Sequence, residues 1–430
     1  MEKEDKAALV PKLRFPEFRN AEPWNRLPLS ELLRERKQRN RDLRFGPREV
    51  LSVSGDHGCV NQIELLGRSY AGASVKEYHV VETGDLVYTK SPLKRNPYGI
   101  IKENKGKPGI VSTLYAVYHV TKKGHPAYLD YFFSSDYNLN SYLQPIVRKG
   151  AKNDMKVNNA AVLTGEIWAP QIEEQRKIAD CLSSLGQLVS AQRQKVEALK
   201  TYKRGLMQQL FPCEGESRPQ FRFPEFRTQP EWDALRIAEL KPFVTSGSRG
   251  WAAYYANHGS LFVRITNLSR DSISLDLTDS KFVNLPSGAS EGVRTQLRTH
   301  DILISITADI GIVGYVDDNV PSPAYINQHI ALVRFENTNV CSKFVAYFLA
   351  SDAAQRSFRS STDNGTKAGM NLIGVQSMPL LLPTLPEQQR IASFLSSLDS
   401  QISAEAQKLL VLKAHSKGLM QCLFPSPEEV

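Results

Sequence analysis

The sequence has few cysteines, and they form no recognisable pattern. The five cysteines lie far apart and no Cys-x-x-Cys pair occurs. This spacing argues against a zinc site and against a disulfide framework, and it fits a reducing compartment. The cysteines are Cys59, Cys181, Cys213, Cys341 and Cys422.

Long apolar runs are also missing. No stretch approaches the roughly 18 uninterrupted apolar residues of a membrane helix, and no apolar signal-peptide segment follows the charged first residues. We therefore expect a cytoplasmic protein with no membrane contact. The chain has 430 residues, of which 41% are hydrophobic and 23% charged, as is typical of a globular protein with two or three domains.

Motifs that carry chemistry are scarce. No Gly-x-x-x-x-Gly-Lys-Ser/Thr loop occurs, so we do not expect this chain to hydrolyse ATP. The eight histidines, among them His57, His79 and His329, form no i, i+4 pair, and we predict no metal site. The segment from Asn96 to Tyr98 partly matches the Asn-Pro-Pro-Tyr/Phe signature of amino-methyltransferases. It lacks the second proline and is better explained as a proline turn.

Three charged residues outline a possible nuclease site. Asp85, Glu103 and Lys105 have the residue types of a metal-dependent nuclease triad. Spaced acids and a lysine also arise in any charged loop, and the Gly-Lys-Pro that follows favours a surface turn. We predict no catalytic residue in this chain.

The sequence does contain a long internal repeat. Residues Ile178–Pro212 and Ile391–Pro425 align without a gap, and more than half of the positions are identical. In both copies, leucine, isoleucine and valine recur at alternating steps of three and four, which predicts a helix with a coiled-coil seam. The seam residues are Leu182, Leu185, Val189, Val196, Leu199 and Leu206 in the first copy, and Leu395, Leu398, Ile402, Leu409, Leu412 and Leu419 in the second.

The two helices are expected to pack on each other, because neither can bury its seam alone. About 33 helical residues would give a rod of about 50 Å. Their polar steps match in position, since Gln192 corresponds to Glu405 and Lys203 to Ser416. We predict an antiparallel coiled coil with an internal pseudo-two-fold duplication, which would place the segments that precede the helices at opposite ends.

The repeat extends beyond the helices. Pro11–Arg19, with Trp24 after it, recurs as Pro219–Arg227 with Trp232, and we call each copy the opening motif. The chain is therefore a duplication of opening motif, variable insert and helix, with a linker near Gly215–Pro219. The predicted boundaries are 1–169 for the first insert domain, 170–212 for the first helix, 213–384 for the second insert domain and 385–430 for the second helix.

Both inserts are predicted to be mixed α and β, which gives an α+β fold class overall. Short β-rich runs bounded by Gly, Pro and Asn precede one helix in each insert. Gly84–Val87 and His300–Leu303 are expected to be equivalent turns that lead into strands. The predicted strands are 50–53, 77–81, 85–88, 109–111 and 115–120, then 261–265, 280–283, 301–306, 312–316 and 330–335, and the predicted helices are 126–142 and 342–359.

Basic and amide side chains gather in the inserts. The net charge is +9, which favours a polyanionic partner. Lys and Arg neutralise phosphates, whereas Arg, Asn and Gln can contact base edges through two hydrogen bonds. The candidate DNA-binding residues are Lys90, Lys94, Arg95, Tyr98, Arg148, Lys149 and Lys152 in the first insert, and Arg249, Trp251, Arg264, Asn267, Asn327, Gln328, Thr366 and Lys367 in the second.

Together these motifs resemble the specificity subunit of type I restriction-modification enzymes. The resemblance covers nearly the whole chain and is carried by the opening motif Arg-Phe-Pro-Glu-Phe, the segment Pro-x-x-x-Glu-Gln-x-x-Ile-Ala before each long helix, and the ending Leu-Met-Gln-x-Leu-Phe-Pro. With Pro170 matched to Pro386, and Glu174 and Gln175 to Gln388 and Gln389, the first copy has one extra residue, Lys177, which would shift where its helix begins.

The resemblance implies two target-recognition domains that read the two halves of a split double-stranded DNA sequence. The helices would act as a spacer and as the dock for two methyltransferase subunits, which motor and nuclease subunits would join. This chain would bind no cofactor, and S-adenosylmethionine, ATP and magnesium would belong to the partner subunits. Two alternatives remain: a non-catalytic scaffold that binds RNA or an anionic protein, and the nuclease described above.

Overall fold

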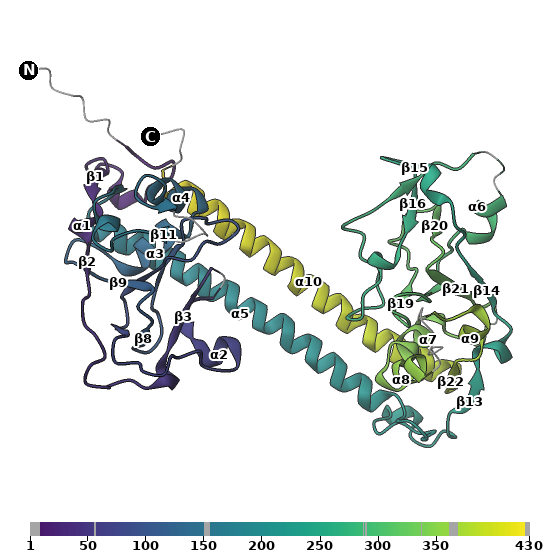
Figure 1. Ribbon diagram of the computed structural model, residues 1–430. Coiled ribbons are helices and arrows are strands. Elements are labelled where there is room, and N and C mark those ends of the chain that lie inside the picture. The colour runs from purple at the N-terminus through teal and green to yellow at the C-terminus, as the bar shows by residue number, and fades with distance from the viewer. Residues whose placement is uncertain are drawn as a thin grey trace, which may run out of the picture. The chain divides into compact units, whose positions relative to one another are not determined.

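The computed structural model describes residues 9–425 apart from 56, 150–154, 287, 289, 337 and 361–368. The chain divides into two compact units. The first comprises Met1–Ala191 and Leu409–Val430, and the second comprises Gln192–Lys408. Each long helix therefore contributes one part to each unit (Figure 1). No helix among the described residues combines the length and apolar character needed to cross a bilayer.

The two predicted long helices are present and have equal length. Helix α5 spans Ile172–Leu210 and α10 spans Leu385–Leu423, and each has 39 residues, or about 58 Å. The expectation of an extra residue in the first copy is wrong. Lys177 forms an ion pair with Glu17 (2.8 Å), just as Arg390 does with Glu225 (3.2 Å), so Lys177 and Arg390 are equivalent.

The true partner of Pro170 is Pro383. The Gln175 Nε2 donates to the Pro170 carbonyl at 2.9 Å, and the Gln388 Nε2 donates to the Pro383 carbonyl at 2.8 Å. The prediction failed because two prolines, Pro383 and Pro386, lie close to the start of α10, and Pro170 was matched to the second of them.

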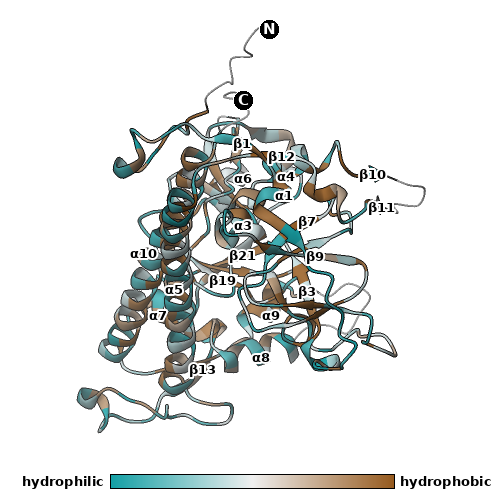
Figure 2. Ribbon diagram, turned by 90° about the vertical axis from the view of Figure 1, so that its left-hand side faces the viewer, coloured by the Kyte–Doolittle hydropathy of each residue, from teal (hydrophilic) through white to brown (hydrophobic). Residues whose placement is uncertain are grey.

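Within each unit, the start of one long helix lies beside the end of the other, so the two helices are antiparallel. In the first unit, Leu182 of α5 shares a buried cluster with Leu423 of α10. In the second, Leu210 of α5 shares a cluster with Leu395 of α10. Figure 2 shows the two helices side by side, each with hydrophobic and hydrophilic residues along its length. All twelve predicted seam residues are buried or half-buried.

Polar residues interrupt the seam and pair across it. Buried Gln192 donates its amide N–H to the Glu405 carboxylate (2.5 Å). Lys203, also buried, donates to Asp399 (2.6 Å), whose other oxygen accepts the hydroxyl of Tyr347 (2.6 Å). A buried charge needs such a partner, because removal from water is costly.

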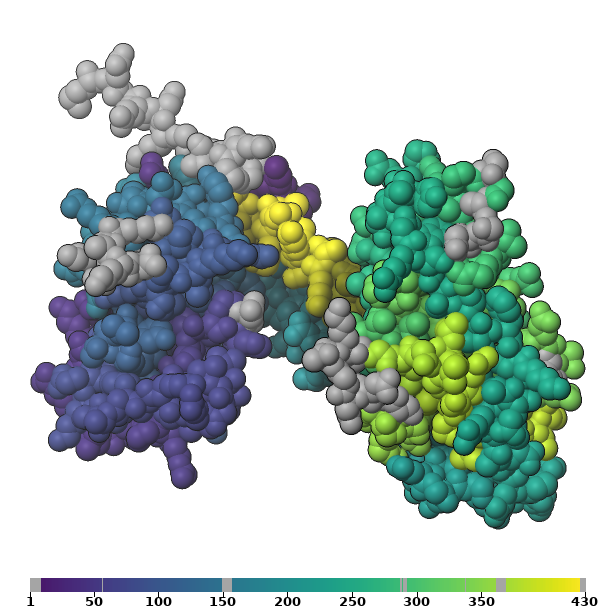
Figure 3. Space-filling view, turned by 45° about the vertical axis from the view of Figure 1, so that its right-hand side comes forward, coloured from purple at the N-terminus to yellow at the C-terminus, as the bar shows by residue number. Residues whose placement is uncertain are grey.

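Each insert begins and ends on a pair of antiparallel strands. Strand β1 (Asn25–Pro28) pairs with β12 (Glu166–Ala169), and β13 (Asp233–Arg236) pairs with β22 (Pro379–Leu382). We call each of these pairs the clasp. In the first unit, the space-filling view shows the yellow end of α10 packed beside blue and purple residues (Figure 3).

In each unit, the opening motif is bonded to the start of the long helix. The Arg14 guanidinium donates to both oxygens of Glu174 (2.9 and 2.7 Å), and Arg222 does the same to Glu387 (2.7 Å twice). All four side chains are buried. Two-bond Arg–carboxylate contacts of this kind fix orientation as well as distance.

The core of each insert is a four-stranded antiparallel sheet, and the strand order is the same in both. The first sheet has the order β2-β9-β6-β7 and the second β14-β21-β18-β19. Their bounds are β2 Leu33–Glu35, β9 Tyr115–Val120, β6 Leu86–Thr89, β7 Ile100–Glu103, β14 Phe243–Ser246, β21 Ile330–Arg334, β18 Ile302–Ser305 and β19 Val313–Tyr315. The predicted duplication of a mixed α and β fold is confirmed.

Each predicted insert helix is in fact two helices. Residues 126–142 form α3 (Pro126–Ser134) and α4 (Asp136–Leu143), and residues 342–359 form α7 (Ser342–Leu349) and α8 (Asp352–Ser360). Ser135 ends α3 and caps α4, because its hydroxyl accepts the Asn138 N–H.

Smaller elements complete the inserts. In the first they are α1 (Leu29–Leu32), β3 (Leu51–Ser54), β4 (Gly58–Asn61), α2 (Gln62–Leu66), β5 (His79–Val81), β8 (Gly109–Val111), β10 (Arg148–Lys149) and β11 (Met155–Lys156). In the second they are β15 (Tyr255–Ala256), β16 (Ser260–Val263), β17 (Phe282–Val283), α6 (Ser290–Thr295), β20 (Ala324–Ile326) and α9 (Leu372–Gln376).

Candidate nucleic-acid interface

Equivalent turns lead into the central strands of the two sheets, as the sequence predicts. The Asp85 carboxylate accepts the Glu82 N–H (2.8 Å), and the Asp301 carboxylate accepts the Arg298 N–H (2.7 Å). An arginine binds each aspartate through two hydrogen bonds, from Arg36 in the first unit and Arg334 in the second. These turns fix one end of β6 and β18.

The opposite ends of β6 and β18 carry the candidate residues. There Thr89 faces Tyr115, and Ser305 faces Ile330, in the same antiparallel register. We call this end of each sheet, where β6 or β18 ends and β9 or β21 begins, the loop edge. Since the sheets share their strand order, the loop edges of the two inserts are equivalent surfaces.

In the first unit, the loop edge is basic. The loop from β6 to β7 exposes Lys94 and Arg95, while Lys90 is half-buried. Burial lowers the pKa of Lys90, which the nearby Glu35 partly offsets. The Arg95 carbonyl accepts the side-chain N–H of Asn140 from α4 (3.0 Å), so the loop is held against its own insert.

Two further contacts shape this loop. Gly99 has a φ of +93°, and a Cβ there would lie 2.0 Å from the Thr89 carbonyl oxygen, so only glycine fits. The Gly99 N–H donates to the Asn96 carbonyl (3.1 Å), which supports the interpretation of Asn96–Tyr98 as a turn, and the Asn96 amide donates to Asp136 (2.8 Å). Tyr98 is half-buried, and its carbonyl accepts the Tyr88 hydroxyl.

In the second unit, the loop edge is hollowed into a polar cavity of about 520 Å³. Two predicted residues, Arg249 and Gln328, line it from different loops. The remaining lining residues are Ser246, Gly247, Ser248, Thr307 and His329. A Cβ on Gly247 would lie 2.3 Å from the Ile326 carbonyl oxygen, so glycine lets the two loops approach closely.

Sequence reasoning missed three residues of this cavity edge. Thr307 and His329 hydrogen-bond to each other (2.6 Å), and Arg294 donates to the Ser246 carbonyl (2.8 Å) and the Ser248 hydroxyl (2.7 Å). The available signal was the polar run Asn327–His329 directly before an apolar strand. That this run lies near Arg249 follows from strand pairing, which sequence spacing alone does not predict.

Other candidate residues do not join the loop edge. Trp251 is buried and stacks on Phe262, with ring centroids 4.9 Å apart. Asn267 is also buried, and its amide donates to the Asp276 carbonyl (2.7 Å). We therefore no longer expect these two side chains to contact DNA directly. Their residue types suited base contact or stacking, but burial assigns them to the core.

The rest have varied positions. Arg264 is half-buried and bonded to Asp279 (2.9 Å), and buried Asn327 accepts the His329 N–H (3.1 Å). Arg148 is exposed on β10, where Lys149 pairs with Met155. Lys152, Thr366 and Lys367 lie outside the described residues.

The nuclease hypothesis gains no support from the geometry. Asp85 is held by Arg36, whereas Lys105 forms an ion pair with Asp130 (2.7 Å) and lies 3.8 Å from Glu103. Burial raises the pKa of Glu103 to about 7, and Lys105 opposes this shift. Among the described residues, no group of three or more His, Cys, Asp or Glu side chains is arranged to hold a metal ion.

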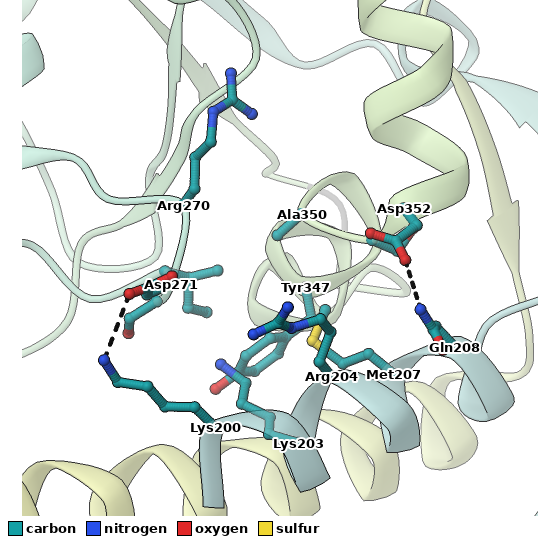
Figure 4. Close-up of a pocket in the computed structure, with 13 residues that line it drawn as sticks. Lys200, Lys203, Arg204, Met207, Gln208, Arg270, Asp271, Tyr347, Ala350 and Asp352 are labelled. Atoms are coloured by element: carbon teal, nitrogen blue, oxygen red, sulfur yellow. Dashed lines mark hydrogen bonds and ion pairs between the residues drawn. The ribbon is translucent and has the colours of Figure 1, made fainter. Parts of the chain in front are cut away.

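Helix α5 is bonded to the second insert. A small cavity of about 130 Å³ lies between them. At this cavity Lys200 forms an ion pair with Asp271 (3.5 Å), and Gln208 donates to Asp352 (2.8 Å). Figure 4 shows both pairs. Beside them, the Lys203 ammonium lies 5.4 Å from the centre of the Tyr347 ring. These contacts attach the second insert to its part of the helix pair.

Comparison with known proteins gives a consistent result. Residues 285–414 match the family model of the type I restriction modification DNA specificity domain. The chain is 22% identical over 270 residues to the type I restriction enzyme MjaVIII specificity subunit of Methanocaldococcus jannaschii, covering 60% of this chain. It is 23% identical over 283 residues to the putative MjaX specificity subunit of the same organism, covering 65% of this chain. The matches span 61% and 63% of these relatives' lengths.

Two solved structures share the fold. One is the S subunit of a type I restriction-modification system from M. genitalium, with a TM-score of 0.59 and 13% identity, covering 97% of this chain and 100% of that one. The other comes from work on assembly of the type I R-M system, with a TM-score of 0.52 and 18% identity, covering 94% and 98%. In sequence and in fold, the chain is thus similar to the specificity subunits of type I restriction-modification enzymes, which confirms the resemblance drawn from its repeated motifs.

Proposed function

We propose that this chain is the sequence-specific DNA-binding subunit of a type I restriction-modification complex and that it recognises a DNA target in two parts. One observation carries the proposal. The two inserts share their strand order but present different side chains at equivalent loop edges, while the helices between them are repeated closely. A shared scaffold with different surfaces suits two readers of two different sequences.

The loop edges have the chemistry that DNA recognition needs. Exposed Lys94 and Arg95 suit phosphate contacts, which position a protein on the duplex. Arg249 and Gln328, at the cavity of the second insert, have donors and acceptors for base edges in the major groove. The net charge of +9 favours approach to DNA.

The target-recognition domains are proposed to span 1–169 and 213–384, and the spacer helices 170–212 and 385–430. The helices would also dock two methyltransferase subunits. In the first unit, Leu188, Leu410 and Val411 are 50%, 59% and 58% exposed, so this part of the helix pair offers apolar surface to a partner.

Catalysis is proposed to belong to the partner subunits. The methyltransferase subunits would bind S-adenosylmethionine, and the motor and nuclease subunits would use ATP and magnesium. The present chain would then select the DNA sequence without binding a cofactor.

Mapping of methylated bases tests this proposal directly. DNA from cells that carry the chain with its methyltransferase partners should be methylated at a site with two specified parts separated by an unspecified spacer. A single uninterrupted site would contradict the proposal. The scaffold alternative predicts instead that random DNA duplexes compete for binding as well as any selected duplex does.

A further inference from the structure

The cavity at the loop edge of the second insert holds an amide side chain in a fixed orientation. We propose that Gln328 reads an adenine in one half of the target and that His329 is a positioning residue that orients it. This inference rests on the proposed function and specifies the base class that one insert recognises.

A chain of hydrogen bonds carries the argument. The Gln328 Nε2 lies 3.0 Å from the His329 Nε2, and the His329 Nδ1 lies 2.6 Å from the Thr307 Oγ1. Because an amide nitrogen can only donate, the His329 Nε2 accepts. The imidazole therefore carries its proton on Nδ1 and donates it to Thr307.

Within the described part of the chain, Gln328 makes no other side-chain hydrogen bond. Its amide keeps one N–H donor and the Oε1 acceptor for a ligand in the cavity. The major-groove edge of adenine offers the matching pair, with N7 as acceptor and N6–H as donor. Guanine presents two acceptors in the same place, so it satisfies only one of the two groups.

The backbone around His329 is held from both sides. Its N–H donates to the Asn327 side chain (3.1 Å), and its carbonyl accepts the Ile306 N–H (2.9 Å). The close approach at Gly247 fixes the neighbouring loop. A side chain held in advance loses less conformational freedom on binding, which favours selective contact.

The first insert lacks this pair. From the matched registers of Thr89 with Tyr115 and Ser305 with Ile330, the positions equivalent to Gln328 and His329 are Thr113 and Leu114. Leu114 is 71% exposed and cannot hydrogen-bond through its side chain. Any effect of Gln328 or His329 should therefore be confined to one half of the target.

The experiment uses the full-length chain and begins with selection of binding duplexes from a random pool. Each base pair of the selected site is then changed, and affinities are measured for the wild type, Gln328→Ala, His329→Leu and His329→Gln. The matched control is His258→Leu, because His258 is exposed and lies outside the cavity.

Gln328→Ala should lower the preference for adenine at one position by about 10- to 100-fold. The other half of the target and the affinity for random duplexes should not change. His329→Leu should lower the same preference by about 5- to 10-fold, since Gln328 remains but is no longer held. His329→Gln offers an acceptor in place of Nε2 and should restore most of it.

Three results would overturn the inference. The first is that Gln328→Ala, with an unchanged melting temperature, retains every base preference. The second is that it weakens both halves equally, and the third is that His329→Gln behaves as His329→Leu does. If the wild-type chain selects no sequence at all, the proposed function fails, and this inference fails with it.

Discussion

At the scale of single residues, the environment of Glu103 opposes the charged form of its side chain. Its side chain lies at the end of β7 near Lys105 and Asp130, and one carboxylate oxygen has no hydrogen-bond partner. Burial raises its pKa from 4.5 to about 7, while Lys105 lowers it and Asp130 raises it. Between these two pH values, the folded chain keeps a proton that the unfolded chain has lost.

This difference makes stability depend on pH in a defined direction. The contribution of Glu103 is most favourable below pH 4.5 and is lost as the pH rises through about 7. Glu103→Gln should therefore be more stable than the wild type at pH 8, by about 1–2 kcal/mol after allowance for solvent screening, and nearly equal to it at pH 4.5.

Urea unfolding of both proteins across this pH range measures the effect. Glu64→Gln is the control, because Glu64 is exposed in the same insert. A constant difference between Glu103→Gln and the wild type from pH 4.5 to 8 would contradict the predicted protonation of Glu103.

Lys94 and Arg95 allow the electrostatic part of the proposed DNA binding to be tested. If each contacts a phosphate, changing both to alanine should weaken binding and lower the slope of log affinity against log salt by about 2. The control is Lys122→Ala with Lys123→Ala, at the other end of β9. Binding at several salt concentrations measures the slope, and an unchanged slope would remove Lys94 and Arg95 from the interface.

At the scale of elements, the long helices depend on a seam whose apolar residues are buried or half-buried. Leu199 and Leu412 are half-buried in that seam. Changing either to aspartate places a charge against apolar side chains and should destabilise the chain by about 2–4 kcal/mol. Ala198→Asp and Lys413→Asp are matched controls, because both residues are exposed neighbours on the same helices.

Circular dichroism in urea reports the loss of helix, and co-purification of methyltransferase subunits reports docking. The double variant Leu199→Asp with Leu412→Asp should fail in both assays. Normal assembly of that variant would show that the seam does not hold the helices together.

The helices were predictable from sequence because their pattern is long and occurs twice. The breaks at Ser135 and near Ser351 were missed although each carries a signal, since a serine precedes an aspartate at the start of α4 and α8. Apolar periodicity ran through both breaks and outweighed the capping signal.

The candidate site was only partly predictable. Residue type identified Arg249 and Gln328, but their meeting depends on the pairing of β14 with β21, which is a long-range contact. Residue type also suggested Trp251 and Asn267, whose burial follows from tertiary packing. His329 was passed over because its partners, Thr307 and Gln328, complete a cluster only in the folded chain.

At the scale of the whole molecule, the two ends of the described chain make the same backbone hydrogen bonds as the segments on either side of the linker between the halves. In the first unit, the Leu13 N–H donates to the Cys422 carbonyl (2.9 Å) and the Trp24 N–H to that of Leu9 (2.9 Å). In the second, the Phe221 N–H donates to the Gln209 carbonyl (2.9 Å) and the Trp232 N–H to that of Ser217 (3.0 Å).

This equivalence predicts a circular permutant that folds. Residue 425 would be joined to residue 9 by a copy of residues 213–216, because these four residues make the equivalent connection in the second unit. The chain would be opened at Gly215, where no other atom lies within 4 Å of an added Cβ. We expect the melting temperature to fall by only a few degrees and the DNA target to remain the same. A permutant opened at Gly99, where backbone packs tightly, should not fold, and equal behaviour of the two permutants would contradict the prediction.

The clasps have a consequence for how the gene of this chain can exchange an insert by recombination. Each insert leaves the scaffold on one strand and returns on its neighbour, through β1 with β12 and β13 with β22. A recombination event with crossovers at the codons of these strands replaces a whole insert and keeps both junctions intact. Under the proposed function, a new target sequence could then be acquired in one genetic step, without a series of destabilising point mutations.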